Sequence, residues 1–541
     1  MSKNIKRVLL LIPLLIIIVQ GCSTDMDVRN DNEPDSRRAL VTPEDIEGLI
    51  SGAFREHWFA VNDQCPGNGL SVIGDEKTSS WGNWGMRDLV WEPRKAWNNS
   101  TTYRYKKFNE DPWYGNYHVI SNINDALERI TEGLEIGDPG STDTQRAVTF
   151  GNFCKGLAYG YIGLFFDRGV LLPESMDLDN YDPQFFRYDD LINSGIWYLN
   201  ECIRLCEDHD FTLPATWING VTITNDDMKK LCHSFMARYM VLKARNNAER
   251  DAADWNSVLS HIDNGITEDF APEGDNDLWW HPVQHSSNWT GWSTASNRLI
   301  GPSDTSSNYQ KWIYLPVNNR NHLIIYSCDR RITGDLTGIT DGKWFSYSRA
   351  FGSPLYFLYN SSYRFTKFGY QYPEAYGPMP HLTMTEMDML RAEAYLRGYG
   401  GGTRDGIAEL INKTRVPSGE MEPLHGNESD LELWKWMCYE KRIETQMTGI
   451  SYFDYRGWSD LRIRGEKVVH MPAGTPVHFP VPGKELELLM VDNYTFGGVG
   501  QPDTTPSLYK TAKVIDMEYI IAARDRINRN NKSENTIPPK K

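Results

Sequence analysis

The chain is poor in positive charge, in paired cysteines and in long apolar runs, and each shortage excludes a class of protein. Its 541 residues carry 56 Lys and Arg against 72 Asp and Glu, which gives a net charge of −16. Nucleic-acid phosphates demand a basic surface, so DNA or RNA is not an expected partner. Seven of the 8 cysteines follow Cys22, an odd number without a CxxC pair, which does not predict a disulfide framework. Cys154, on the apolar face of a predicted helix, is expected to be a buried free thiol.

The sequence also lacks the short motifs of common catalytic and metal sites. Neither HExxH nor GxSxG occurs. The segment 338–343 ends in Gly-Lys but is too short for a phosphate-binding loop, and Asp275 begins a calcium-like loop that lacks its glycine and its closing Glu. His281 and His285 could share a zinc ion, but no third ligand accompanies them. We therefore predict no cofactor, no metal and no catalytic residue, although the many carboxylates leave a glycosidase pair open.

The first residues have the pattern of an export signal. Three basic residues precede an apolar run, Val8 to Val19, which is shorter than the ~20 residues that a membrane-spanning helix needs. The small residue Gly21 then stands before Cys22. A cysteine at this point resembles the lipobox of bacterial lipoproteins, whose thiol receives a diacylglyceryl group; an ordinary signal peptide with a chance cysteine is the alternative. We predict a signal peptide over residues 1–21 and a palmitate-type lipid anchor on Cys22.

Helical periodicity divides the rest of the chain into two kinds of region. Residues 22–40 are polar, which predicts a flexible tether, and residues 526–541 predict a polar tail. Apolar stripes with helical spacing recur over about 41–265 and 380–450. Residues from about 266 to 380 and from about 450 to 525 are rich in Gly, Pro, Ser, Asn and aromatics, with strand-like pieces at 323–326 and 355–358. Asp111-Pro112 has the pattern of an N-cap and a first-turn proline.

Tryptophan is abundant, with 18 residues, and much of it lies outside helical stripes. Three close pairs stand among Gly, Ser, Asn and Thr: Trp81 and Trp84, Trp279 and Trp280, and Trp289 and Trp292. Aromatic side chains in polar loops either fill the interior of a long loop or face a ligand. By contrast, Trp113 and Trp434 lie on helical stripes and are predicted to be core residues.

Five segments, in order along the chain, resemble motifs of the RagB/SusD family of outer-membrane nutrient-uptake lipoproteins of Bacteroidetes. They are residues 113–124, 147–169, 384–415, 440–458 and 478–486. Arg391-Ala392-Glu393-Ala394 resembles the family's helix-pair motif, and Glu440-Lys441-Arg442-Ile443-Glu444 resembles its ERR-x-E signature. The match runs from roughly residue 40 to 500. The chain departs from the pattern at Tyr455, where Leu is common, and in a longer end beyond Gln501.

The resemblance implies a mostly α fold of tetratricopeptide-type helix pairs over residues 41–525, with a loop-rich second half that contains short strands. It implies a lipid-anchored location on the outer membrane, exposed at the cell surface, and a SusC-like TonB-dependent transporter as partner. The ligand in this family is usually an oligosaccharide or polysaccharide. The expected function is therefore glycan binding and delivery rather than catalysis. An oligopeptide ligand is the first alternative, and a surface glycoside hydrolase or a structural helical scaffold is less favoured.

Stacking on aromatic rings is the expected mode of glycan binding. A sugar packs its C–H face on a ring while amide and charged side chains bind its hydroxyl groups. Each ring contributes ~0.5–1.5 kcal/mol, so three or four give ~2–6 kcal/mol, around the ~4 kcal/mol of a millimolar site. We expect Trp84→Ala and Trp292→Ala each to weaken binding about tenfold without changing the melting temperature. For Trp279 and Trp280, contact with the transporter is the alternative. The predicted ligand-binding residues are Trp81, Asn83, Trp84, Trp289, Trp292 and Trp312.

Overall fold

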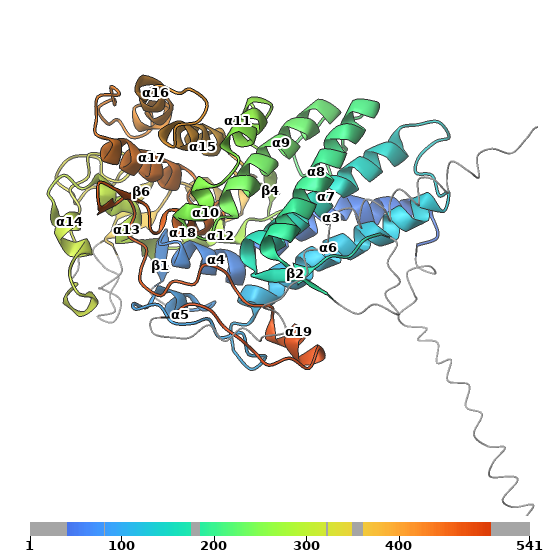
Figure 1. The fold of residues 1–541 in the computed structure, drawn as a ribbon, viewed down its shortest axis with the longest axis horizontal. Coiled ribbons are helices and arrows are strands. Elements are labelled where there is room, and N and C mark those ends of the chain that lie inside the picture. Colours follow the sequence, from blue (N-terminus) through green and yellow to red (C-terminus); the bar gives the residue numbers. More distant parts are fainter. Residues whose placement is uncertain (1–39, 80–81, 175–183, 321–322, 349–360, 499–541) are drawn as a thin grey trace, which may run out of the picture.

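The computed structural model describes residues 40–79, 82–174, 184–320, 323–348 and 361–498 (Figure 1). The predicted signal peptide, Cys22, nearly all of the tether, the strand-like piece at 355–358 and the C-terminal tail lie outside these ranges. Within them, no helix combines the length and the apolar composition that crossing a membrane requires.

The described chain is mostly helical, which confirms the predicted fold class. The earlier helices are α3 (Pro43–Asn62), α4 (Gln64–Ile73), α5 (Met86–Val90), α6 (Lys107–Thr131), α7 (Asp143–Phe165), α8 (Tyr188–Asp208), α9 (Asn225–Leu242), α10 (Asn247–Asp251) and α11 (Trp255–Asp263). The later helices are α12 (Pro282–Ser287), α13 (Asn297–Ile300), α14 (Asn308–Ile313), α15 (Met384–Leu396), α16 (Arg404–Arg415), α17 (Asp430–Glu444), α18 (Ser451–Trp458) and α19 (Gly483–Leu488). Short 3-10 turns are η2 (Gly301–Ser303), η3 (Val317–Asn319) and η4 (Gly369–Gln371).

The described strands are short and pair antiparallel, two by two. The pairs are β1 (Lys77–Ser79) with β5 (Ser293–Ala295), β2 (Arg168–Val170) with β3 (Phe185–Arg187), β4 (Glu273–Asp275) with β8 (Tyr376–Pro378), β6 (Phe345–Tyr347) with β7 (Tyr363–Phe365), and β9 (Arg462–Ile463) with β10 (Glu466–Lys467). The strand predicted at 323–326 is wrong: the segment is irregular, and only the next residue, Ser327, forms a bridge, with Asp304.

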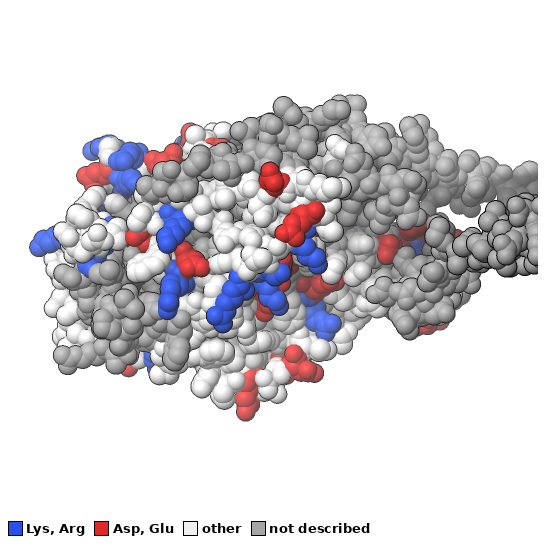
Figure 2. All heavy atoms as spheres, turned by 90° about the horizontal axis from the view of Figure 1, so that it is seen from below, with Lys and Arg blue, Asp and Glu red and all other residues white. Residues whose placement is uncertain are grey.

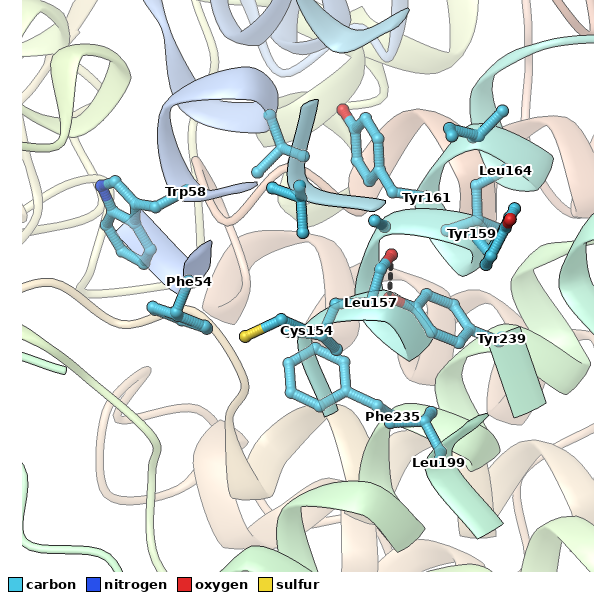
Figure 3. Packing of buried hydrophobic residues seen from close by; sticks show 14 of the residues in the cluster. Phe54, Trp58, Cys154, Leu157, Tyr159, Tyr161, Leu164, Leu199, Phe235 and Tyr239 are labelled. Carbon is cyan, nitrogen blue, oxygen red and sulfur yellow. Dashed lines mark hydrogen bonds between the residues drawn. The ribbon is translucent and has the colours of Figure 1, made fainter. Parts of the chain in front are cut away.

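The long helices α3 and α6 to α9 lie side by side at one end of the molecule, with β2 against α7 and α8, and helices α13 to α17 occupy the other end (Figure 1). Helix α7 lies among its neighbours and is buried along most of its length. The stripe that predicted this helix is fully inside, with each residue at most 9% exposed: Phe150, Cys154, Leu157, Tyr161 and Leu164. Figure 3 shows this packing, with the Tyr239 hydroxyl of α9 donating to the Leu157 carbonyl at 3.1 Å.

Glycines allow α7 and α8 to approach each other closely. A Cβ placed on Gly195 of α8 would lie 2.8 Å from both the Gly156 carbonyl oxygen and the Gly160 nitrogen of α7. In the other direction, a Cβ on Gly156 would meet the Leu199 side chain at 2.7 Å. The two helices therefore pack backbone to backbone at this point, which no larger residue permits.

Helix α6 begins earlier than predicted. Asp111-Pro112 was expected to start the helix, but α6 starts at Lys107 and contains Pro112 within it. The chain has already turned before the proline, because Asn109 N and Glu110 N both bond the Lys106 carbonyl. A proline this near the helix start removes a single backbone hydrogen bond. An Asp-Pro pair can therefore lie about one turn inside a helix as well as at its start, so this pattern does not fix the first residue of the helix.

The cysteines of the described chain are free thiols, and Cys154 is fully buried as predicted. Burial raises the pKa of Cys154 far above its ordinary value, so the thiol is neutral and inert. Cys202, Cys206 and Cys232 are likewise buried and free. Over the described residues, no group of three metal-binding side chains is assembled.

Positive charge is not evenly distributed over the surface. The whole chain has a net charge of −16. On the face shown in Figure 2, however, Lys and Arg side chains gather near the middle of the molecule, with some Asp and Glu among them. An anionic ligand can therefore approach parts of this acidic protein without general repulsion.

Candidate functional site

Two of the aromatic loops predicted to bind a ligand meet because β1 and β5 pair. Lys77 lies opposite Ala295, and Ser79 lies opposite Ser293. The Thr78 and Thr294 hydroxyls are 3.1 Å apart across the pair. The chain that leaves β1 therefore runs beside the chain that enters β5, which brings the loop around residue 84 to the loop of 289–292 from about two hundred residues away.

Four of the six predicted ligand-binding residues form one cluster there. The Trp84 and Trp292 rings have centroids 4.9 Å apart and planes at 63°, and the Trp289 and Trp292 rings are 5.7 Å apart at 62°. The Trp292 indole N–H donates to Asn83 Oδ1 at 3.2 Å. Trp292 is only 7% exposed, whereas Trp84 and Trp289 are half-buried. Trp292 thus supports two outer rings from behind, and Trp292→Ala should lower the melting temperature as well, contrary to the sequence-based expectation.

The backbone of the Trp84 loop is held in an unfavourable conformation. Trp84 has φ = 53°, between Gly82 at 70° and Gly85 at 75°. Left-handed backbone costs a residue with a side chain ~1–2 kcal/mol. Met86 N bonds the Asn83 carbonyl at 3.1 Å, and the Cys65 thiol donates to the Trp84 carbonyl at 3.7 Å, which fixes the loop. Such strain is concentrated at functional sites, and here it sets the direction of a tryptophan ring.

The row of rings continues to two residues that sequence reasoning did not assign to the site. The His285 ring lies 5.8 Å from Trp289 and 6.0 Å from Tyr372, whose side chain is 56% exposed. Trp280 Nε1 donates to His285 Nδ1 at 3.0 Å. Burial lowers the pKa of His285, so the imidazole is neutral and able to accept this bond. A run of tyrosines at 370, 372 and 376 in a polar segment was the one sequence signal for Tyr372.

A buried lysine lies beneath the cluster. The Lys77 ammonium is 5.1 Å from the centre of the Trp292 ring, and it donates to Asn68 Oδ1 and, at 3.0 Å, to Ser287 Oγ. Burial lowers the pKa of Lys77 to about 7, against the opposing effect of the neighbouring Glu76. The cation over the inner ring adds a cation–π attraction that anchors Trp292.

Two predicted residues remain, Trp81 and Trp312. Trp81 is outside the described residues. Trp312 is 4% exposed in a separate core cluster, with the Arg298 and Arg320 guanidinium groups 5.6 and 5.0 Å from its ring. The structure therefore brings together Asn83 and three tryptophans but places Trp312 apart from them.

The other tryptophans follow their expected roles with one exception. Trp113 and Trp434 are 3% and 4% exposed, which confirms them as core residues. Trp279, for which contact with a transporter was the alternative, is only 5% exposed and stacks on Phe54 at 6.1 Å. Of the alternatives given for this loop residue, its burial in the main core fits the one in which the aromatic ring fills the interior. Trp280 is half-buried, and its N–H is used by His285.

Comparison with solved structures assigns the fold. A SusD superfamily protein from Parabacteroides distasonis superposes with a TM-score of 0.57 at 14% identity, over 85% of this chain and 99% of that one. A SusD-like protein from Bacteroides fragilis gives 0.57 at 14% identity, over 87% and 99%, and another SusD superfamily protein from the same organism gives 0.55 at 15% identity, over 84% and 100%. This chain has the SusD fold.

The likeness concerns the fold, since all of these identities are low. No family model matches the chain, and no curated protein matches it. The SusD fold extends over both regions of the molecule, because the matched structures are covered almost completely. The predicted arrangement, helix pairs followed by a loop-rich part, is therefore confirmed at the level of the fold, and the ring cluster lies in loops of that fold.

Proposed function

We propose that this protein binds glycans at the cell surface and delivers them to a SusC-like TonB-dependent transporter in the outer membrane. The observation that carries the proposal is the contiguous row of rings, Trp84, Trp292 and Trp289, with the Asn83 amide beside it. Sugar rings stack on aromatic faces, and an amide binds their hydroxyl groups. Two half-buried rings supported by a third present a pre-arranged platform that needs little ordering when a ligand arrives.

The chemistry at the cluster supports binding rather than cleavage. Among the described residues, the polar groups that contact its rings include the Asn83 amide, the His285 imidazole and the Lys77 ammonium. Glycoside hydrolysis usually needs two carboxyl groups on either side of the bond. An affinity from two or three stacked rings amounts to ~1–4.5 kcal/mol, which favours weak, rapidly reversible capture. Rapid release suits a protein that passes its ligand to a transporter.

Calorimetry with the full-length protein in detergent tests the binding function. The panel contains plant, host and microbial polysaccharides and a casein digest. We expect one glycan class to bind with millimolar to micromolar affinity and Trp84→Ala to weaken it about tenfold, or ~1.4 kcal/mol. Trp197→Ala is the matched control, since Trp197 is a half-buried tryptophan of α8 that packs on Tyr198 with ring centroids 4.8 Å apart.

Three outcomes would contradict the proposal. Heat only with the peptide digest would assign the ligand to oligopeptides. Reducing ends that accumulate on incubation with a polysaccharide would show an enzyme. Equal losses in Trp84→Ala and Trp197→Ala would show that a general effect on folding, and not stacking, explains the change.

Anchoring and delivery need a separate experiment. We expect the wild-type protein to fractionate with the outer membrane and to co-purify with a large barrel protein. Cys22→Ala should release it from the membrane fraction, because the lipid is the predicted anchor. A Cys65→Ala control, which changes a buried thiol, should leave fractionation unchanged. Membrane retention of Cys22→Ala would contradict the lipid anchor.

A further inference from the structure

Four arginines gather around two carboxylates at the junction of β1, α13 and α17. Arg94 Nη2 donates to Asp75 Oδ1 at 2.8 Å. Arg298 binds both oxygens of Glu92 at 2.6 and 3.0 Å, and Arg320 binds Glu92 at 2.8 Å. These side chains are all less than one-tenth exposed. A charged group so deeply buried is stable only when an opposite charge or several hydrogen bonds compensate it.

Within the described residues, the side chain of the fourth arginine, Arg442, has only backbone carbonyls as hydrogen-bond partners. Its Nη1 donates to the Arg298 carbonyl at 3.0 Å, and its Nη2 donates to the Gly74 and Asp75 carbonyls at 2.8 and 3.1 Å. The Nε–H groups of Arg94, Arg298 and Arg442 meet no acceptor within the described chain. Donors of this kind are rarely left without a partner inside a protein.

The cluster therefore carries an excess of positive charge. Its four guanidinium groups face two carboxylates, Asp75 and Glu92. Burial raises the pKa of Asp75, and the arginines around it offset this only in part. Glu76 lies near Arg442, but burial raises the pKa of Glu76 to about 7, so only about half of it is ionised at pH 7. In a protein of net charge −16, the guanidinium groups of this cluster thus outnumber the carboxylates paired with them among the described residues.

A cavity of about 260 Å³ opens directly beside this cluster. Arg298 and Arg442 form part of its wall, and the Tyr455 ring packs on the Arg442 guanidinium at 4.3 Å. The further lining includes the side chains of Tyr309, Lys435, Trp436, Tyr439 and His470, together with aliphatic residues and the acidic Asp304 and Glu432. Aromatic faces combined with convergent charged groups are typical of a site for a small polar ligand.

The acidic residues of the cavity wall are already engaged. Asp304 accepts bonds from Tyr309 N at 2.9 Å and Tyr326 N at 3.0 Å, and Glu432 caps α17 by accepting from Ser429 N at 2.8 Å. Burial lowers the pKa of His470 to about 4, and nearby Lys467, Arg298 and Lys435 lower it further. These three cations therefore lie close to this side of the cavity.

We propose that this cavity is a second ligand site, which binds the carboxylate of an acidic sugar residue, a uronic acid, against Arg442 and Lys435. The aromatic wall takes the sugar ring, and the carboxylate supplies the negative charge that the arginine cluster lacks. The site is distinct from the tryptophan row. The charge balance alone supports a ligand with a carboxylate group in this cavity. The choice of a sugar acid as that ligand rests on the proposed function.

Calorimetry of the full-length protein in detergent with glucuronate, glucose and acetate tests this site. We expect glucuronate to bind with millimolar affinity, and glucose and acetate to bind at least tenfold more weakly. Lys435→Glu should weaken glucuronate binding tenfold or more, and this variant should fold because the Lys435 side chain is 35% exposed. Arg442 is unsuitable for substitution, since its Nη groups hold three backbone carbonyls.

Lys413→Glu is the matched control, because Lys413 is an exposed lysine of α16 paired with Asp388 at 2.7 Å. It should bind glucuronate like the wild type. Absence of glucuronate binding, equal affinity for glucose, or unchanged binding in Lys435→Glu would each overturn the site, and equal affinity for acetate would overturn its assignment to a sugar. Polysaccharide binding is measured on the same samples, so a failure confined to glucuronate leaves the tryptophan row intact.

Discussion

The helical region and the loop-rich region satisfy the hydrogen-bonding groups of their backbones in different ways. In α3 and α6 to α9 the backbone bonds are made within each helix, so the space between helices is filled by apolar side chains such as Phe54 and Leu157. In the loop-rich region, carbonyl groups without helical partners accept from arginine side chains: the buried Arg320 donates to the Ile313 and Leu315 carbonyls, and the half-buried Arg330 donates to those of Ser327 and Thr333. At these positions, arginine side chains thus satisfy carbonyl groups that no regular secondary structure pairs.

The largest expected effect comes from breaking the ionic anchor of the loop-rich region. Arg331 is fully buried and binds Asp329, Glu440 and Glu444 at 2.6–2.8 Å. Arg331→Met would leave three carboxylates facing one another, so we expect a loss of ~3–5 kcal/mol in the free energy of unfolding. Chemical denaturation measures this loss.

The control for Arg331→Met is a surface pair. Arg404 is 46% exposed and pairs with Asp430, and Arg404→Met should change the free energy of unfolding by less than ~1 kcal/mol. If both variants lost equally little, buried charge would not be the means by which the loop-rich region is held.

The second prediction concerns the pH dependence at the junction of the two regions. Glu76 accepts a bond from Met447 N at 3.2 Å, and burial raises its pKa from 4.5 to about 7. A raised pKa in the folded state means that this group's contribution to stability is complete below pH 4.5 and is lost as the pH rises through 7. Glu76→Gln keeps the acceptor without the charge. The variant should equal the wild type near pH 4.5 and exceed it by about 3 kcal/mol above pH 7.

Denaturation of both proteins across that pH range measures the difference. Asp254→Asn is the control, because Asp254 is an N-cap carboxylate of α11 whose pKa is lowered by bonds from Ser257, the opposite direction. A Glu76→Gln advantage that grew toward low pH would contradict the assigned sign.

The third prediction addresses the helical region, where space rather than charge is decisive. Gly195→Ala would place a Cβ 2.8 Å from the α7 backbone, so we expect a loss of ~1–3 kcal/mol in the free energy of unfolding. Gly52→Ala in α3 is the matched control, since nothing lies within 4 Å of its added Cβ. That variant should gain ~0.4–1 kcal/mol from higher helix propensity. Opposite signs in thermal denaturation would support the comparison, and equal signs would contradict it.

The sequence could predict the features that the local spacing of residues encodes. The stripe of α7 and the burial of Trp113 follow from periodicity, and the loop position of Trp84, Trp289 and Trp292 follows from the polarity of neighbouring residues. The β1–β5 pairing that unites Asn83 with Trp292 was not predictable, because nothing local in Lys77–Ser79 specifies a partner at Ser293–Ala295. For the same reason Trp312 was predicted to bind a ligand and the burial of Trp279 was left open, although both are core residues.

The arginine cluster was beyond local reasoning for a related cause. Arg94, Arg298, Arg320 and Arg442 come from four separate segments, and in the sequence each looks like an ordinary surface residue. Arg442 stood out in the sequence only as part of the segment that resembles the ERR-x-E signature, and no contact was predicted for it. Long-range contacts of charged side chains leave no periodic signal, whereas apolar contacts do.

The smallest effect should come from the exposed end of the ring row. Tyr372 is 56% exposed and contacts His285, so Tyr372→Ala removes one outer stacking face without disturbing the core. We expect unchanged stability and a loss of ~0.5–1 kcal/mol in affinity, confined to oligosaccharides long enough to extend past Trp289. Tyr376, 52% exposed on β8, is the control, and Tyr376→Ala should leave the affinity unchanged. Calorimetry with a series of chain lengths measures both, and an equal loss for short and long ligands would restrict the site to the three tryptophans.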